Sequence, residues 1–181
     1  MCNNVRLSDI NNDLMEEQYS TVPYIRFPVT MKILLTPLLA TKRYCALSNL
    51  HNLDAIRAMI DPNGANIYGT TGTDKIMTGI QSFHEKYADV FWIFKSYKIE
   101  ENPSKVLIDF DRYWTVKEED SSRIEIQYSS ASEVIEFNDE SRIISIAYSS
   151  PPTEPALFGP SYPHCRAEVL DECRTTMINT E

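Results

Sequence analysis

The sequence predicts an α+β fold in which three N-terminal helices pack on a curved antiparallel sheet. Apolar residues recur at helical spacing in three segments between residues 36 and 88. Long segments of alternating apolar and polar residues follow between residues 91 and 148, separated only by short loops. Strands joined by short loops pair antiparallel. Helices that gather on one side of such a sheet define the α+β layer class.

We divide the chain into three parts. Residues 1–35 are a polar N-terminal extension, residues 36–150 hold the expected helices and sheet, and residues 151–181 form a proline-rich tail. The tail cannot enter a sheet interior, because proline lacks the backbone donor that a sheet requires. Its Leu157, Phe158 and Tyr162 are still able to lie across the domain or across a partner. A last helix is expected at Cys165 to Met177.

The ends of the three expected helices carry recognisable signals. Thr36–Pro37 is an N-cap followed by proline at the first helical position, and this helix runs to about residue 50 with Asn49 facing solvent. The second helix spans residues 53–60 and stops at a turn rich in proline, asparagine and glycine. Thr73 or Asp74 is expected to cap the third helix, which runs to about residue 88.

A short strand is expected at residues 65–68, and long strands are expected at residues 91–100, 105–118, 124–137 and 142–148. In the strand 124–137 the apolar positions are even up to Tyr128 and odd from Ala131, which predicts a β-bulge near Ser129–Ser130. The last two strands form a hairpin that needs helices over its apolar face, because a lone hairpin is marginally stable. We expect this hairpin to form the wall of a cone-shaped cavity.

The composition argues against several classes of function. The net charge is −9 and no cluster of lysine and arginine is visible, so no nucleic-acid partner is expected. The most apolar run, residues 31–40, is too short for a bilayer, and the first ten residues lack a secretory pattern. We therefore expect a cytoplasmic protein with no membrane partner. The four cysteines and three histidines lack metal-ligand spacing, so no metal and no cofactor is expected, although Cys165 and Cys173 are close enough in sequence to cross-link.

Three short motifs follow one another across residues 36–150. They are Arg43-Tyr44 with Asn52-Leu53-Asp54-Ala55-Ile56, then Gly69 to Gly72 ahead of the third helix, then Glu133 to Asp139 running into Ser141-Arg142-Ile143. In their order and spacing these motifs resemble the NTF2-like superfamily, specifically its SnoaL-like and ketosteroid-isomerase-like members. The resemblance implies a cone of curved sheet closed by three helices. It also implies a pocket that, in the enzymes, holds steroids, polyketides or similar apolar rings.

The resemblance also implies roles for particular residues. Ketosteroid isomerases bind the substrate oxygen with a tyrosine from helix one and a protonated acid from a long strand, positions that match Tyr44 and Glu133. Their base position falls on Gly69 or Tyr68, and neither abstracts a carbon-bound proton at neutral pH. In a dehydratase-like variant His51, or less readily His84, would be the base. The alternative for Tyr44 is a core aromatic whose hydroxyl meets a backbone carbonyl.

Strand alternation predicts which residues face the pocket. In the strand 105–118 the apolar residues are even-numbered, so Arg112 shares the inner face while Asp109 and Asp111 face solvent. If Glu133 also faces inward, the two could form a buried pair that keeps Glu133 ionised. The expected ligand-binding residues are Arg112 and the aromatic residues Tyr68, Phe83, Trp92 or Phe94, Phe110, Trp114 and Tyr128.

Two hypotheses of function result. The first is a small-molecule pocket protein of the SnoaL-like type, acting on an apolar ring substrate as an isomerase, cyclase or dehydratase through the three catalytic candidates Tyr44, His51 and Glu133. The second is a non-catalytic NTF2-like interaction module that forms a homodimer through the outer sheet face, where Tyr97, Tyr113 and Thr115 are expected. The sequence leaves both open, because one fold hosts many functions and specificity lies in the shape of the pocket.

Overall fold

The computed structural model describes residues 35–117, 124–162 and 166–180. The helices are α1 (Pro37–Asn49), α2 (Leu53–Met59), α3 (Thr73–Lys86) and α4 (Arg166–Asn179). The strands are β1 (Asn66–Ile67), β2 (Thr70–Thr71), β3 (Phe91–Ile99), β4 (Lys105–Lys117), β5 (Ile124–Phe137), β6 (Ile143–Ser150) and β7 (Ala156–Gly159). Residues 1–34 of the expected N-terminal extension lie outside the described residues.

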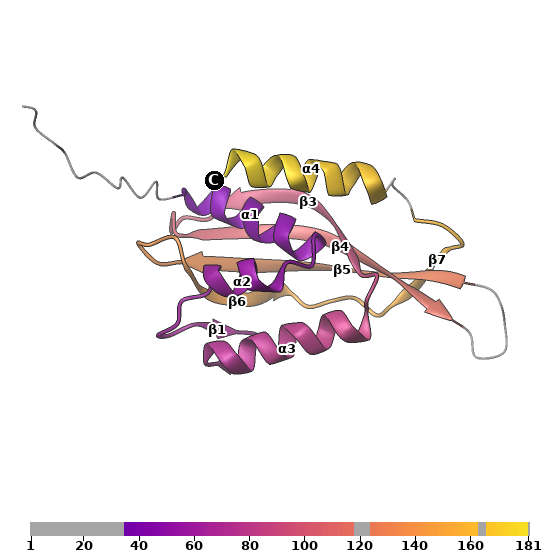
Figure 1. Ribbon diagram of the computed structural model, residues 1–181, viewed down its shortest axis with the longest axis horizontal. Helices are drawn as coiled ribbons and strands as arrows, with labels where there is room; N and C mark the ends of the chain where they lie inside the picture. Colours follow the sequence, from indigo (N-terminus) through magenta and orange to yellow (C-terminus); the bar gives the residue numbers. More distant parts are fainter. Residues whose placement is uncertain (1–34, 118–123, 163–165, 181) are drawn as a thin grey trace, which may run out of the picture. The chain divides into compact units, whose positions relative to one another are not determined.

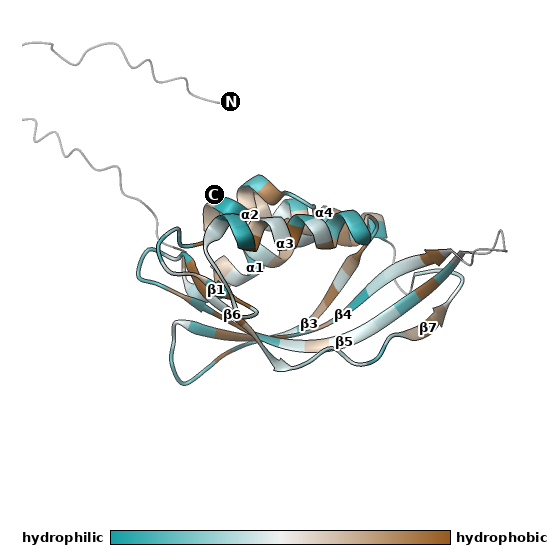
Figure 2. Cartoon of the chain, turned by 90° about the horizontal axis from the view of Figure 1, so that it is seen from below, coloured by the Kyte–Doolittle hydropathy of each residue, from teal (hydrophilic) through white to brown (hydrophobic). Residues whose placement is uncertain are grey.

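The helices lie against the concave side of one curved sheet (Figures 1 and 2). The strand order is β2-β1-β6-β5-β4-β3, with β7 paired to β5 off this path. The expected α+β class with a curved sheet is confirmed, but the sheet is mixed, because β1 pairs with β6 in parallel. The domain helices are joined by α4, which confirms the helix expected in the tail and packs on α1. No helix in the described part of the chain is long and apolar enough to cross a membrane.

The helix starts follow the predicted signals only in part. Thr36 caps α1 as expected, since its Oγ1 accepts a hydrogen bond from the backbone N–H of Leu39 at 3.3 Å. At α3 the prediction was wrong. Gly72, with φ at 89°, occupies the cap position and forms no side-chain cap bond, in place of Thr73 or Asp74. Glycine adopts this positive φ without steric cost, so the chain turns sharply into α3.

Asn49 is only 4% exposed, so the expectation that it faces solvent was wrong. Its amide Nδ2 donates to the carbonyl oxygen of Trp92 at 3.0 Å, and its Oδ1 accepts from the Trp92 backbone N–H at 2.8 Å. The amide also lies 3.8 Å from the Sγ of Cys173 in α4. Helix α1 is therefore buried on two sides. Asn49 also provides hydrogen-bond partners for the backbone N–H and C=O groups of Trp92 at the start of the edge strand β3.

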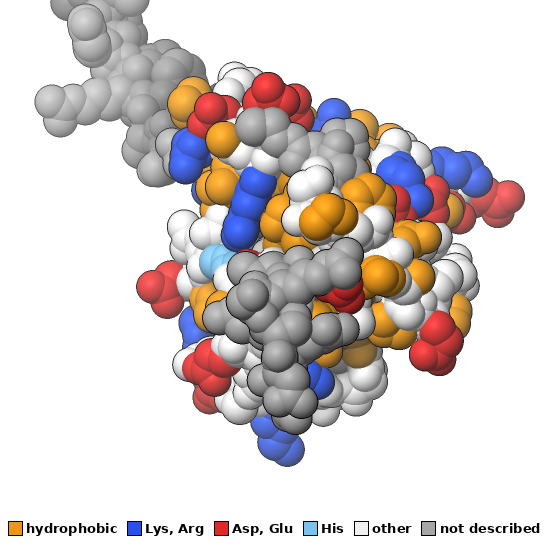
Figure 3. Space-filling model, turned by 90° about the vertical axis from the view of Figure 1, so that its right-hand side faces the viewer, with side chains coloured by type: hydrophobic (Ala, Val, Ile, Leu, Met, Phe, Trp, Pro, Cys, Tyr) orange, Lys and Arg blue, Asp and Glu red, His pale blue; other side chains and the backbone are white. Residues whose placement is uncertain are grey.

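The tail wraps over one end of the sheet, which confirms that its aromatic residues lie across the domain. Strand β7 pairs with the first half of β5, where β6 does not reach. Phe158 packs edge-on against Tyr113 and Tyr128, with ring centroids 5.4 and 5.9 Å apart. The hydroxyl of Tyr162 donates to Asp89 Oδ2 at 2.9 Å. Figure 3 views this end, where hydrophobic side chains lie on the surface among charged ones.

The predicted bulge near Ser129–Ser130 is absent, because β4 and β5 pair in one unbroken register over their whole length. The buried side changes instead. Ala131 belongs to the main core under the helices, whereas Ile126 belongs to a second cluster with Phe91 and Tyr113 on the outer side, next to the tail. The change from even to odd apolar positions in β5 therefore has another cause. The two halves of one regular strand bury opposite faces against two different cores.

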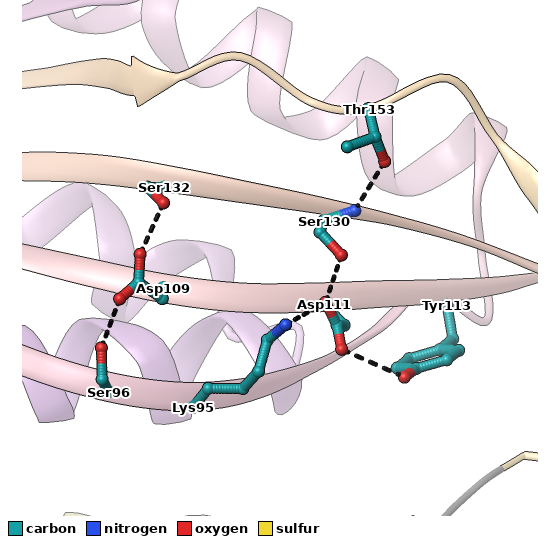
Figure 4. A network of polar contacts seen from close by, with 8 residues as sticks. All are labelled: Lys95, Ser96, Asp109, Asp111, Tyr113, Ser130, Ser132 and Thr153. Atoms are coloured by element: carbon teal, nitrogen blue, oxygen red, sulfur yellow. Dashed lines mark hydrogen bonds and ion pairs between the residues drawn. The ribbon is translucent and has the colours of Figure 1, made fainter.

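The middle of the outer face is polar (Figure 4). Asp109 accepts hydrogen bonds from the hydroxyls of Ser96 and Ser132, both at 2.5 Å, and Asp111 accepts from Ser130 at 2.5 Å and pairs with Lys95 at 2.6 Å. Both aspartates therefore face away from the helices, as predicted.

Of the three residues expected on the outer face, Tyr113 and Thr115 lie there and Tyr97 does not. Tyr113 is 5% exposed beneath Phe158. An irregularity between Phe94 and Ser96 turns Tyr97 to the inner face, where it packs on the main core. Only Thr115 is both outward and partly exposed. Two of the three residues therefore cannot supply an exposed aromatic surface for a dimer.

Candidate functional site

A cavity of about 320 Å³ lies between the inner face of the sheet and helices α1, α2 and α3. Its apolar wall comes mainly from isoleucine and phenylalanine side chains on these elements: Ile56, Ile67, Ile76, Ile80, Phe83 and Phe110. The polar groups come from α1, the turn between β1 and β2, the start of α3 and the sheet: Tyr44, Ser48, Tyr68, Thr70, Lys75, Arg112, Glu133 and Tyr148. A mostly apolar hollow with a few convergent polar groups is typical of a small-molecule site.

The structure brings together many, but not all, of the predicted site residues. Those that line the cavity are Tyr44, Tyr68, Phe83, Trp92, Phe110, Arg112 and Glu133. Those that lie outside it are His51, Phe94, Trp114 and Tyr128.

The three aromatic residues outside the cavity have identifiable surroundings. Tyr128 lies on the outer face, stacked on Tyr113, because its parity on β5 is opposite to that of Glu133. Phe94 faces inward but packs against Phe110 on the side away from the cavity, where it lines a separate hollow. Trp114 faces inward beyond the end of the cavity and packs edge-on against a tyrosine of α3's C-terminal end. Alternation thus gave the inward facing of Phe94 and Trp114 but not their position along the sheet, and for Tyr128 the predicted facing itself was wrong.

Glu133 is the central acid of the site and is 5% exposed. Burial raises its pKa to about 7, opposed by a hydrogen bond from the Tyr68 hydroxyl, at 2.6 Å from Oε1, and by the charge of Arg112. Among the described residues the expected direct ion pair between Glu133 and Arg112 does not form, and Nε of Arg112 donates instead to Ser129 Oγ at 2.8 Å. Glu133 is therefore partly protonated at neutral pH, because the effect of burial outweighs the Tyr68 hydrogen bond and the more distant charge of Arg112.

Tyrosines surround this carboxyl group. Tyr68 has φ at 50°, a left-handed conformation that is uncommon for an aromatic residue. Its ring is 45% exposed and stacks on Tyr148 at 4.7 Å, while its hydroxyl points inward to Glu133. Burial and the charge of Glu133 raise the pKa of Tyr44 far above its usual range. Tyr44 thus remains a neutral hydroxyl that is able to donate a hydrogen bond at any physiological pH.

Of the two candidate histidines, His84 on α3 lines the cavity, whereas His51 in the turn between α1 and α2 does not. Their rings lie 4.4 Å apart, and Nε2–H of His51 donates a hydrogen bond to the carbonyl oxygen of Val90 at 3.1 Å. Nδ1 of His84 is buried without a hydrogen-bond partner, and burial together with His51 lowers the His84 pKa to about 4. His84 is therefore a neutral imidazole at pH 7. The ring of His51 packs against it but does not line the cavity.

Sequence reasoning missed several lining residues on α3. Lys75 and Gly79 lie one turn apart on the same side as Phe83, so the i, i+4 spacing that identified the apolar stripe would have found them. Gly79 leaves room, because a Cβ built on it would meet no atom within 4 Å. Ser48 and Tyr148 carried no comparable signal.

Among the residues that the structure describes, no three His, Cys, Asp or Glu side chains gather in a way that would hold a metal ion. Cys45 and Cys173 are buried free thiols. Cys165, expected as a possible partner of Cys173, lies outside the described residues.

No family model and no curated protein matches the sequence. Solved structures do match. An NTF2-like protein of unknown function from Exiguobacterium sp. 255-15 is 12% identical over 62% of this chain and 98% of its own, with a TM-score of 0.51. An epoxide hydrolase/cyclase-like enzyme, SalBIII, described in pyran ring formation in the polyether salinomycin, is 15% identical over 66% of this chain and 93% of its own, with a TM-score of 0.50.

A third structure is a protein from Mycobacterium tuberculosis in complex with estradiol-17beta-hemisuccinate. It is 8% identical over 65% of this chain and 95% of its own, with a TM-score of 0.50. At such low identities these similarities establish how the chain is folded, and the chemistry of the cavity has to be argued from its own residues.

Proposed function

We propose that this chain, which has the NTF2-like fold, binds an apolar ring molecule with a carbonyl oxygen and catalyses a proton transfer next to that carbonyl. One observation carries the proposal. Glu133 is a buried carboxyl group with its pKa near 7 in a cavity of about 320 Å³, and Tyr68 holds it at 2.6 Å. A general acid or base works best when its pKa lies near the working pH.

The site offers matched groups for such a reaction. Tyr44 supplies a neutral O–H to the carbonyl oxygen, which gains negative charge as a proton leaves the neighbouring carbon. Ionised Glu133 accepts a proton, and protonated Glu133 returns one. His84 lies on the helical wall of the cavity, and its lowered pKa makes it a weak base. Isomerisation, cyclisation and dehydration of a ring ketone all use this proton transfer.

Two proteins of the same fold are consistent with this ligand class. SalBIII is described in pyran ring formation, and the Mycobacterium tuberculosis protein was crystallised with an estradiol derivative. Because the identities are 15% and 8%, the proposal rests on Glu133, Tyr68 and Tyr44 rather than on these relatives.

A ligand screen with a built-in comparison tests the proposal. Native mass spectrometry and thermal shift are measured with steroid, polyketide and terpenoid ketones and with their parent hydrocarbons. Ketones are expected to bind one per chain and to raise the melting temperature. Tyr44→Phe is expected to weaken ketone binding by about tenfold while leaving hydrocarbon binding unchanged, because only the ketone loses a hydrogen bond. Equal effects on both classes, or no binding at all, would contradict it.

Catalysis is tested separately from binding. Loss of deuterium from the carbon next to the carbonyl is followed by NMR for a ketone that binds. Glu133→Gln keeps an acceptor for the Tyr68 hydroxyl but cannot transfer the proton, so the exchange rate is expected to fall at least about 100-fold. Binding with an unchanged exchange rate in this variant would leave a binding protein without the proposed chemistry.

A second candidate is the interaction module, for which a different observation speaks. Leu107, Val134 and Ala147 lie opposite one another in register across β4, β5 and β6 on the outer face, and Val134 and Ala147 line an open hollow there. We infer that a homodimer would use this apolar row. Val134→Lys should then convert a dimer to monomers in light scattering, whereas Glu85→Lys, at an exposed position on α3 away from the outer sheet face, should not. A monomeric wild type would remove this candidate.

A further inference from the structure

The ionisable groups that line the cavity give it a positive charge. Arg112 and Lys75 are its cations. Glu133, with its pKa near 7, is only partly ionised at neutral pH, and His84, with its pKa near 4, is uncharged. The chain as a whole carries a net charge of −9. A positive cavity in an acidic protein indicates that the ligand supplies negative charge, because a cation facing an apolar space is costly without an anion.

Arg112 is held in place by a hydrogen bond and by two aromatic rings, with no carboxylate paired to it among the described residues. Its Nε donates to Ser129 Oγ at 2.8 Å, and its guanidinium carbon lies 5.8 Å from the ring centres of both Phe83 and Trp114. A side-chain hydrogen bond also links it to Tyr148. In the described part of the chain, no carboxylate forms an ion pair with Arg112.

These contacts leave the guanidinium group oriented and only partly used. An arginine side chain carries five N–H donors in a planar fork, and the contacts to Ser129 and Tyr148 account for few of them. The geometry of such a fork matches two oxygens of a carboxylate, and bonds between charged groups are the strongest of their kind. Lys75 is exposed and also lines the cavity, so it adds attraction from the solvent side.

We propose that the ligand of this cavity is an amphipathic acid, a ring system whose carboxylate is bound by the guanidinium group of Arg112. This inference rests on the proposed function, since it names the class of molecule that the same site accepts. The apolar body lies against the isoleucines of α2, β1 and α3, and the carboxylate lies at the sheet wall. The absence of a protein carboxylate at Arg112 is explained because the ligand provides one.

The proposal has a consequence for pH. Four ionisable residues on other elements lie around Glu133. They are Arg112 on β4, Tyr44 on α1, Tyr68 in the β1–β2 turn and Tyr148 on β6. Of these only Arg112 is charged. An ionised Glu133 repels an incoming carboxylate, so binding of the acid is expected to weaken as the pH rises from 6 to 8. Binding of a neutral ring is expected to change less.

Matched ligands test this inference in the full chain. A naphthalene carboxylate and its carboxamide have nearly the same shape, as do a steroid carboxylate and its amide, and their affinities are measured by calorimetry at pH 6.5. The carboxylates are expected to bind about 10- to 100-fold more tightly than the amides, as a charged hydrogen-bonded pair requires. Arg112→Gln is expected to remove this preference while changing amide binding by less than about threefold. Arg57→Gln, an exposed arginine on α2, is the matched control for net charge.

Each outcome decides the question. Equal binding of acid and amide by the wild type overturns the inference and leaves the proposed function intact. A preference for acids that survives Arg112→Gln overturns the assignment to Arg112. Failure of every acid and amide to bind overturns the inference alone if ring ketones still bind, and failure of the ketones as well overturns the proposed function too. If Arg112→Gln does not fold, Arg112→Lys keeps the charge without the planar fork, and an undiminished preference in that variant contradicts bidentate binding.

Discussion

At the scale of the residue, the behaviour of Glu133 follows from what surrounds it. Burial favours its neutral form, the Tyr68 hydroxyl favours the ionised form, and Arg112 acts only at a distance because it bonds to Ser129. The result is a carboxyl group that changes charge near neutral pH. Without the Tyr68 bond the balance would move further toward the neutral acid.

The raised pKa of Glu133 predicts how stability depends on pH. The folded group has its pKa at about 7, whereas the ordinary pKa of a glutamate is 4.5. Between these values the folded state binds more protons, so the contribution of Glu133 to stability is fully present below pH 4.5 and is lost as the pH rises toward and past 7. In urea unfolding, Glu133→Gln is expected to remove roughly 2 kcal/mol of the wild-type decrease between pH 5 and pH 8.

Glu136→Gln provides the control for this titration. Glu136 lies on the same strand but on the outer face, where it pairs with Lys105 at 3.4 Å. Its replacement is expected to leave the pH dependence close to that of the wild type. If Glu133→Gln and Glu136→Gln give the same slope as the wild type, Glu133 does not titrate as inferred.

At the scale of the element, the tail makes the outer face of the sheet into a second core. Strand β7 covers aromatic side chains of β4 and β5, and Val169 of α4 reaches the same cluster as Phe91. Tyr162, which lies between β7 and α4 in the sequence, attaches the tail to the domain through the hydrogen bond from its hydroxyl to Asp89. Asp89 also accepts a hydrogen bond from the backbone N–H of Thr115 at 3.1 Å, so one carboxylate connects β4 and the tail.

A double-mutant cycle on Asp89 and Tyr162 measures how firmly the tail is docked. Tyr162→Phe keeps the ring against Phe91 and removes only the hydroxyl, and Asp89→Asn removes the charge. The coupling free energy is expected to be about 1 kcal/mol, because the bond involves a charged but partly exposed acceptor. Tyr162→Phe in a protein that already carries Asp89→Asn should cost much less. A coupling near zero would show that the tail is held by the aromatic contacts alone.

At the scale of the whole molecule, the fold leaves a cavity between the sheet and helices α1, α2 and α3, where close packing would otherwise be expected. The curved sheet and the three preceding helices cannot meet closely everywhere, and Gly79 on α3 widens the gap further. An empty apolar hollow costs contacts on every side. The retained space therefore indicates a ligand site rather than a packing optimum.

Filling the hollow should stabilise the protein and abolish binding. Gly79→Leu introduces a side chain into space where a Cβ meets nothing within 4 Å. It also replaces the poorest helix former after proline, so thermal unfolding is expected to show a gain of at least about 1 kcal/mol. Ring ligands should no longer bind. Gly79→Ala is the matched control, with a similar gain in helix stability and most of the cavity kept. Normal ligand binding by Gly79→Leu would place the ligand elsewhere.

Much of the fold was predictable because it depends on local patterns. The Thr36–Pro37 start, the apolar stripe of α3 and the inward position of Arg112 each follow from residues near in sequence, since period and capping are local properties. Tyr44 and Glu133 were placed toward the cavity by the resemblance to a known fold and not by local pattern. The reasoning from alternation failed for Tyr97, where an irregularity in β3 changed the facing of the strand.

What the sequence by itself determined about this protein is the kind of elements and which side of each is apolar, because alternation and helical spacing are written in neighbouring residues. Tertiary structure alone decided that the tail covers one end of the outer face, that His84 rather than His51 lines the cavity, and that Arg112 bonds to Ser129 rather than to Glu133. These outcomes depend on distances between segments far apart in the chain, and protonation of Glu133 depends on burial that only the assembled layers create.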